Sequence, residues 1–141
     1  MLDNIQDPGN MGTIIRSAAA FHFDTIIVGN DCVDVYSPKV VRASQGMLFH
    51  VNIIVKPLGP AIEELKKQNY QILATNVTGG NNLKTLEKKE KFAIIMGNEG
   101  QGVKKELLNK SDSYLYIDIA STCESLNVGV AASIIMYELD K

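Results

Sequence analysis

The chain has 141 residues, of which 45% are hydrophobic and 21% charged, and its formal net charge is −2. These proportions suit a single globular domain and exclude collagen-like, intrinsically disordered and coiled-coil proteins. The small negative charge also argues against a strongly basic nucleic-acid binder.

Short runs rich in Ile and Val alternate along the chain with segments of helical periodicity. Continuous hydrophobicity within the runs is typical of parallel strands buried on both faces. The pattern therefore predicts an α/β fold, a three-layer sandwich around a parallel sheet, with ligands bound at the C-terminal ends of the strands. In chain order, the sequence predicts a helix at Met11–Phe21, a strand at Thr25–Gly29, a helix at Pro38–Met47, a strand at Val51–Val55, a helix at Pro60–Gln68, strands at Gln71–Ala74 and Phe92–Gly97, a helix at Val103–Asn109, a strand at Tyr114–Ile119 and a helix at Leu126–Leu139.

The first candidate site segment is DPGNMGTIIR, residues 7–16. Its Pro and Gly predict a turn, and Asn10 is a good N-cap for the helix that follows. Arg16 lies among small and apolar residues on that helix, where an unpaired buried charge is very costly. Arg16 therefore either meets an anionic group of a substrate or has a structural role, paired with a carboxylate such as Glu99 or with carbonyls at a helix end.

The second segment is GNEGQG, residues 97–102, directly after a predicted strand. Glycines in such a loop let the backbone approach a ligand closely. The spacing is neither that of a Walker A loop nor GxGxxG. A ligand-binding loop and a tight turn both remain open for it.

The third segment is STCESLN, residues 121–127, between the last predicted strand and the last helix. Its Ser, Thr and Asn side chains can cap the helix, which is apolar on nearly all sides. Such a helix is either a central element or packs against a second subunit. Cys123 has no histidine in a recognisable catalytic context, so we expect it to be a bystander and not a nucleophile.

In this order and spacing the three segments resemble one known family. NxGxxxR near a helix start, an apolar strand ending in MGNEGQG, and a final SLNVxVAAxI helix are similar to the three motifs of the SpoU/TrmH family. These proteins are S-adenosylmethionine-dependent RNA 2′-O-ribose methyltransferases of the SPOUT superfamily. The resemblance extends from Leu2 to Leu139.

The resemblance implies a C-terminal trefoil knot, a homodimer and bound S-adenosylmethionine, with no metal. Residues 1–141 would form the catalytic domain, and the N-terminal RNA-binding domain of many family members would be absent from this chain. The implied cofactor-binding residues are Thr75, Asn76, Val77, Gly97, Asn98, Glu99, Gly100, Ile117, Ile119, Ser125, Leu126 and Asn127. The implied catalytic residues are Asn10, Arg16, Glu99, Ser125 and Asn127.

A guanidinium is a poor base, so we expect Arg16 to orient a phosphate and lower the pKa of the attacking 2′-hydroxyl instead of taking its proton. The proton acceptor is then an RNA phosphate, water or a deprotonated Arg16, and the sequence does not choose among them. His22, Asp118 and Gly129 stand where the family commonly has glycine, proline and serine. None of these departures removes an implied catalytic position.

The expected function is therefore methylation of a ribose 2′-hydroxyl in structured RNA, either tRNA or rRNA. The alternative is a non-catalytic RNA- or nucleotide-binding module of the same fold, which would be expected to lack Asn10, Arg16 or Asn127. Only residues 56–110 carry a net positive charge, so we expect much of the RNA-binding surface to lie outside this chain. Two distant cysteines, no signal peptide and no membrane-length apolar run predict a cytoplasmic protein without membrane contact.

Overall fold

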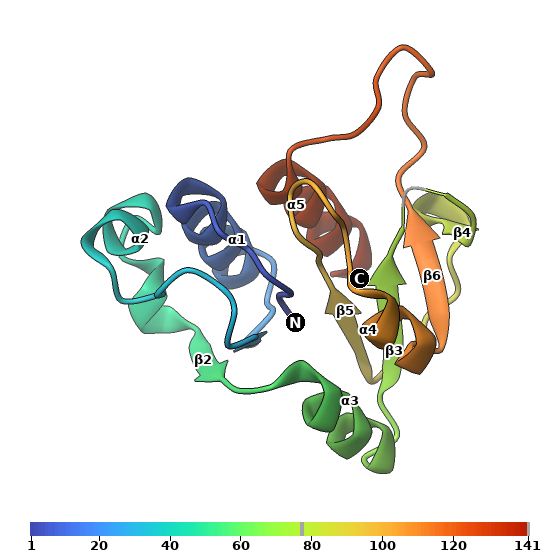
Figure 1. Cartoon of the computed structure of the whole chain (residues 1–141), viewed down its shortest axis with the longest axis horizontal. Helices are drawn as coiled ribbons and strands as arrows, with labels where there is room; N and C mark the ends of the chain where they lie inside the picture. The colour runs from blue at the N-terminus through green and yellow to red at the C-terminus, as the bar shows by residue number, and fades with distance from the viewer. Residues whose placement is uncertain (77, 141) are drawn as a thin grey trace.

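The computed structural model describes residues 1–76 and 78–140, which form helices around parallel strands (Figure 1). One pair of strands and one group of four are each parallel throughout. The pair has the order β1-β2, and the group has the order β4-β6-β3-β5. The strands are β1 (Thr25–Val28), β2 (Asn52–Val55), β3 (Gln71–Thr75), β4 (Asn81–Asn82), β5 (Phe92–Ile95) and β6 (Ser113–Tyr116).

Leu2 connects the two groups of strands. It forms parallel bridges to Val28, just at the end of β1, and to Met96, just after β5. The Leu2 amide donates to the carbonyl of Ile27, and the Asp3 amide donates to that of Met96, each at 2.9 Å. The order across the molecule is therefore β2-β1-Leu2-β5-β3-β6-β4.

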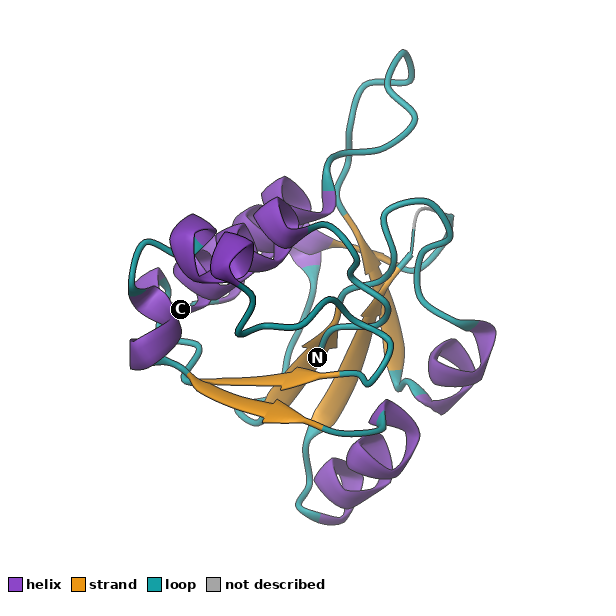
Figure 2. Cartoon of the chain, turned by 60° about the vertical axis from the view of Figure 1, so that its left-hand side comes forward, coloured by secondary structure: helices purple, strands orange, loops and turns teal. Residues whose placement is uncertain are grey.

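Helices cover both faces of this sheet (Figure 2). Helix α1 packs against α2 and α5, whereas α3 packs against α4. The predicted three-layer α/β sandwich with a parallel sheet is thereby confirmed, and the knot stays a prediction. The helices are α1 (Pro8–Ala20), α2 (Pro38–Ala43), α3 (Leu58–Lys67), α4 (Lys105–Lys110) and α5 (Val128–Leu139), with short 3-10 turns η1 (Met47–His50) and η2 (Leu83–Thr85).

Each face of the sheet has its own apolar core. Successive residues of β3 alternate between the two cores, so that Leu73 belongs to the core shared with α1 and α5, and Ile72 to the core shared with α3 and α4. In β5, Ile94 and Ile95 divide in the same way. Because side chains of a strand point alternately to opposite faces, burial of both faces requires the continuous hydrophobic runs seen in the sequence.

Two predicted helix boundaries were wrong by three residues or more, the start of α1 and the end of α2. Helix α1 begins at Pro8, because the Asp7 side chain accepts a hydrogen bond from the Asn10 amide at 2.9 Å and so caps the helix. Asn10 is thus inside the helix and is not its N-cap. Helix α2 ends at Ala43 and does not reach Met47, because Gly46 has a φ of 81° and interrupts the helical backbone before η1.

The connection between β6 and α5 is the longest irregular part of the chain. This loop begins directly after Tyr116, the last residue of β6. The observed strand is therefore shorter than the predicted one, which extended to Ile119. In both views this loop extends away from the rest of the molecule (Figures 1 and 2). Among the described residues, no helix has both the length and the apolar character needed to cross a membrane.

Candidate functional site

A cavity of about 600 Å³ lies at the carboxyl ends of β3, β5 and β6, where the fold class places ligands. The loop after β5 and the loop between β6 and α5 form much of its wall. Apolar side chains of Leu115, Ile117 and Leu126 line it together with the polar backbone of the glycine-rich loop. This mixture of apolar walls and a few polar groups is typical of a small-molecule site.

Most of the predicted cofactor-binding residues surround this cavity. Asn127 is adjacent to it, at the N-cap of α5, and Val77 lies outside the described residues. Their binding role stays a prediction. The predicted residues that line the cavity are Thr75, Asn76, Gly97, Asn98, Glu99, Gly100, Ile117, Ile119, Ser125 and Leu126.

A chain of hydrogen bonds joins the three sequence segments at the edge of the cavity. The Asn127 side-chain amide donates to Oδ1 of Asn10 at 2.9 Å. The side-chain amide of Asn10 in turn donates to Oε1 of Glu99 at 3.3 Å. The same carboxylate oxygen accepts from the backbone amide of Asp7 at 3.3 Å. Residues far apart in the sequence are thus held together, and Asn10, buried in α1, is the central member.

The glycine-rich loop is a closed turn. Asn98 and Gly102 exchange two backbone hydrogen bonds, of 3.1 and 2.9 Å. A Cβ atom at Gly97 would lie 2.2 Å from the carbonyl carbon of Gly102 and from the amide nitrogen of Val103. The tight turn therefore requires glycine at position 97. The same turn lines the cavity, and its role in ligand binding stays a prediction.

Three charged residues that sequence reasoning missed fix the end of this loop. Asp3 is 1% exposed, accepts from the Lys104 amide at 2.8 Å, and lies 3.2 Å from its Nζ. Lys104 Nζ also pairs with Asp31, and this hydrogen bond raises the pKa of the lysine. Burial raises the pKa of Asp31, but the hydrogen bonds that the Asp31 carboxylate accepts, from Lys104 first, and the charge of that lysine together outweigh this effect. The pKa of Asp31 therefore lies below its usual value. Nothing in the local sequence marks these residues, because they meet only in the fold.

Arg16 lies apart from this chain of hydrogen bonds. It is exposed on α1, and among the described residues it has no hydrogen-bond or ion-pair partner. Glu99, the carboxylate considered for a structural pairing, is bonded to Asp7 and Asn10 instead. The structural role for Arg16 is therefore not supported, and its guanidinium is available to an external anion.

The remaining predicted residue, Ser125, is exposed in the loop between β6 and α5. Its carbonyl accepts a hydrogen bond from the thiol of Cys123 at 3.2 Å. The structure does not bring the Ser125 side chain into the hydrogen-bonded chain of Asn10. Within the described part of the chain, no group of three or more His, Cys, Asp or Glu side chains could hold a metal ion.

An all-parallel α/β sheet with a cavity built from the loops after its strands defines a ligand-binding protein of the open-sheet class. Comparison with known families refines this class. The sequence model of the SpoU rRNA Methylase family matches residues 1–137, so the chain belongs to that family.

Individual relatives agree with this assignment. The 23S rRNA (guanosine(2553)-2′-O)-methyltransferase RlmP of Bacillus subtilis is 39% identical over 139 residues, which cover 99% of this chain and 56% of that protein. The chain thus spans little more than half the length of the curated relatives it matches.

Two solved structures also resemble this chain over nearly its whole length. The crystal structure of an AdoMet-bound rRNA methyltransferase from Sinorhizobium meliloti has a TM-score of 0.92 and 33% identity, over 97% of this chain and 53% of that one. The SpoU methyltransferase AviRb of Streptomyces viridochromogenes, in complex with AdoMet, has a TM-score of 0.89 and 30% identity, over 97% and 56%.

Proposed function

We propose that residues 1–141 form a catalytic domain that transfers a methyl group from S-adenosylmethionine to a ribose 2′-hydroxyl in ribosomal or transfer RNA. The observation that carries this proposal is the hydrogen-bonded chain from Asn127 through Asn10 to Glu99, at the edge of a cavity at the carboxyl ends of the strands. The names of the relatives support the reaction and the class of substrate.

The cavity suits S-adenosylmethionine. Its volume of about 600 Å³ lies within the range of roughly 300–1,000 Å³ usual for small-molecule sites. Ile117, Ile119 and Leu126 offer an apolar surface to the adenine ring. Residues 97–102 line the cavity beside this apolar surface. When bound there, the cofactor supplies an electrophilic methyl group on a sulfonium sulfur.

The chain's own residues prepare the acceptor. In the transfer the 2′-oxygen would form a bond to the methyl carbon, and the carbon–sulfur bond would break with its electron pair remaining on sulfur. The hydroxyl proton would pass to an RNA phosphate, to water or to a deprotonated Arg16. Arg16 is a permanently charged, exposed cation on a surface helix, so it can hold an RNA phosphate and stabilise negative charge that develops on the 2′-oxygen. Glu99 and Asn10 keep the cavity loop and α1 in one arrangement.

We further infer that the protein acts in the cytoplasm as a homodimer. Val130, Ile134 and Tyr137 form an exposed apolar stripe on α5, with spacings of four and three residues. A two-fold dimer through this stripe would cover it. Such an arrangement would also allow Arg16 of one protomer to approach the cavity of its partner.

The proposal is tested by donor binding and methyl transfer. Isothermal titration calorimetry with S-adenosylmethionine is expected to show saturable binding. Incubation with tritium-labelled donor and total RNA lacking the modification is expected to label the RNA, and mapping would locate a 2′-O-methyl group. Donor binding without any transfer at high RNA concentration would favour the non-catalytic binding module, and loss of both would contradict the proposal.

A further inference from the structure

The Asn98 side chain uses both its oxygen and its nitrogen to fix the loop between β5 and α4. Oδ1 accepts from the backbone amides of Gly100 at 2.9 Å and Gln101 at 3.0 Å. Nδ2 donates to the backbone carbonyl of Asn4 at 2.8 Å, across 94 positions of the sequence. The oxygen thus closes the turn on itself, while the nitrogen ties the turn to a distant segment.

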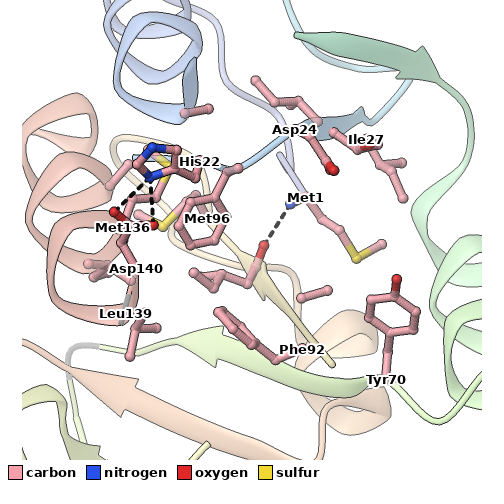
Figure 3. Close-up of a pocket in the computed structure, with 18 of the residues that line it drawn as sticks. Met1, His22, Asp24, Ile27, Tyr70, Phe92, Met96, Met136, Leu139 and Asp140 are labelled. Carbon is pink, nitrogen blue, oxygen red and sulfur yellow. Dashed lines mark hydrogen bonds and ion pairs between the residues drawn. The ribbon is translucent and has the colours of Figure 1, made fainter. Parts of the chain in front are cut away.

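The Asn4 carbonyl is a fixed point, because the residues before it are held in the sheet. The Met1 nitrogen donates to the Ile94 carbonyl at 2.6 Å, beside the cavity drawn in Figure 3, and Leu2 bridges both groups of strands. The Asn4 amide donates to Oδ1 of Asp31 at 3.2 Å. Asn4 has a φ of 55°, a left-handed conformation that asparagine adopts more readily than most residues. A loop bonded to this carbonyl is therefore bonded to the sheet.

The two ends of the same loop are held by Asp3. The Asp3 amide donates to the carbonyl of Met96, where the loop starts, at 2.9 Å. Its carboxylate accepts from the Lys104 amide, where the loop ends, at 2.8 Å. Between these ends, among the described residues, only Asn98 and Glu99 have side chains hydrogen-bonded outside the loop. Glu99 joins the loop to α1, so Asn98 is the side chain that joins its centre to the sheet.

Hydrogen bonds decide the conformation of this loop, because burial contributes little. Residues 99–102 are all exposed. Gly102 has a φ of 72°, and it exchanges two backbone hydrogen bonds with Asn98. Exposed segments with few apolar contacts open easily. The three bonds of the Asn98 side chain are therefore expected to determine how often the loop is closed.

Asn98 lines the candidate cavity, yet most of its hydrogen-bonding capacity is already used. An amide oxygen has two lone pairs, and both of them accept from the loop; one of the two Nδ2 hydrogens is directed at Asn4. The side chain is thus committed mainly to the shape of the loop.

We propose that Asn98 is a positioning residue of the methyl-donor site, which holds the glycine-rich loop closed and fixed to the sheet before S-adenosylmethionine binds. The inference rests on the proposed function, since it takes this cavity as the site of the methyl donor. A loop that is already ordered loses less conformational entropy when its ligand binds. Asn98 therefore sets the affinity for the methyl donor, whereas other residues set the rate of transfer from the bound donor.

Two substitutions separate the two ends of the side chain. Asn98→Ala removes all three hydrogen bonds. Asn98→Asp keeps an acceptor for the two loop amides but places an oxygen against the Asn4 carbonyl. The matched control is Asn82→Ala, because Asn82 Oδ1 also accepts from the amide two residues later, that of Lys84, but lies outside the cavity lining.

The first measurement needs no ligand. Hydrogen exchange of the Gly102 amide is followed by NMR, because this amide donates to the backbone carbonyl of Asn98, which neither substitution removes. We expect exchange to be about tenfold faster in both Asn98 variants, as loss of roughly one net hydrogen bond predicts, and unchanged in Asn82→Ala. Unchanged exchange in either Asn98 variant would overturn the proposal.

The second measurement is binding. Calorimetry uses S-adenosylhomocysteine, which lacks the sulfonium charge that an introduced aspartate would attract. Both Asn98 variants are expected to bind it about tenfold more weakly than the parent protein and the Asn82→Ala control. The KM for S-adenosylmethionine should rise by a similar factor, while kcat at saturating methyl donor stays within about twofold.

A purely structural role would lower the temperature of unfolding and leave affinity and KM unchanged, and this result would overturn the proposal. A fall in kcat as large as the rise in KM would also overturn it, because Asn98 would then act in the transfer itself. A parent protein that binds neither compound contradicts the proposed function and this proposal with it. A parent that binds, with Asn98 variants that bind equally well, contradicts this proposal alone.

Discussion

Asn10 uses both ends of its side-chain amide, accepting from Asn127 and donating to Glu99. Asn10→Asp keeps the acceptor but replaces the donor by an oxygen facing the Glu99 carboxylate. We expect the free energy of unfolding to fall by about 1–3 kcal/mol, measured by urea denaturation at neutral pH. Asn82→Asp is the matched control, because within residues 1–76 and 78–140 the Asn82 side chain only accepts, from the Lys84 amide, and an aspartate preserves that bond. Equal stability of the two variants would contradict the role of Asn10.

Arg16 acts on the substrate in the proposed reaction and lies outside the cavity lining. Arg16→Ala is therefore expected to lower methyl transfer at least about 100-fold, as loss of a charge-stabilising donor does. Donor affinity in calorimetry should stay within a few-fold. Arg16→Lys should fail as well, because an ammonium lacks the planar fork of donors.

The control for this prediction is Arg42→Ala, which removes the chain's other arginine, also exposed and on α2. It is expected to retain transfer. Full activity in Arg16→Ala would remove Arg16 from the mechanism.

The Met1 ammonium makes stability depend on pH. Its pKa is lowered from 8.0 to about 5 by burial, so between these values the unfolded chain binds a proton that the folded chain does not. The free energy of unfolding should therefore rise with pH across this window, by up to about 1.4 kcal/mol per pH unit, and level off above pH 8. Urea denaturation between pH 5.5 and 8.5 measures this slope.

The Nα-acetylated protein isolates the effect, since it lacks the ammonium and is otherwise the same chain. A smaller slope in the acetylated protein is expected. Parallel pH profiles of the two proteins would show that the Met1 amine does not contribute.

At the scale of elements, the loop from β5 to α4 depends on a single glycine. Gly97→Ala would place Cβ 2.2 Å from the backbone of residues 102 and 103, so the turn must open. We expect donor affinity to fall at least tenfold and the free energy of unfolding to fall by about 1–3 kcal/mol. Gly59→Ala, on α3 and outside the lining of the cavity, is the control: its Cβ would meet Glu106 Oε1 at an ordinary 3.4 Å. Similar donor affinities for both variants would contradict the assignment of the loop.

Element prediction from sequence succeeded where residue type alone decides the structure. The runs of Ile and Val in β1, β2, β3 and β5 locate these strands to within two residues at either end. The sequence could not predict two features of the sheet, the bridges of Leu2 and the two-residue strand β4. Each involves only one or two residues, which pair as a strand because of partners far away in the sequence. The start of α1 was missed because Asp7 and Asn10 are both good caps by type.

At the scale of the whole molecule, α5 presents apolar side chains to solvent. Ile134 is 38% exposed at the centre of the stripe, and Ile134→Asp would place a charge there. We expect light scattering to show a dimer for the parent protein at tens of micromolar and a monomer for the variant. Val55→Asp is the control, because Val55 is 54% exposed on β2, away from the stripe, and should leave the dimer intact. A monomeric parent protein would contradict the dimer.

The sequence identified some residues of the candidate site and missed others. The motif segments identified Asn10, Glu99 and Asn127, and the fold brings these three into contact. Their order in the hydrogen-bonded chain depends on side-chain directions that spacing does not encode. Asp3 and Lys104 were missed because their pairing joins residues about a hundred positions apart.

The central place of Leu2 has a consequence for how the chain is synthesised. A ribosome makes residues 1–3 before the strands on either side of them, and Met96, one of the partners of Leu2, emerges only after β3 and β5. Pairing of β1 with β2 and of β3 with β5 involves much shorter separations and can form earlier. Residues 1–3 are therefore paired on both sides only after much of the chain has been made. Until then the nascent chain has two separate groups of strands, and the apolar edges between them are a natural point for chaperone contact or for misassembly.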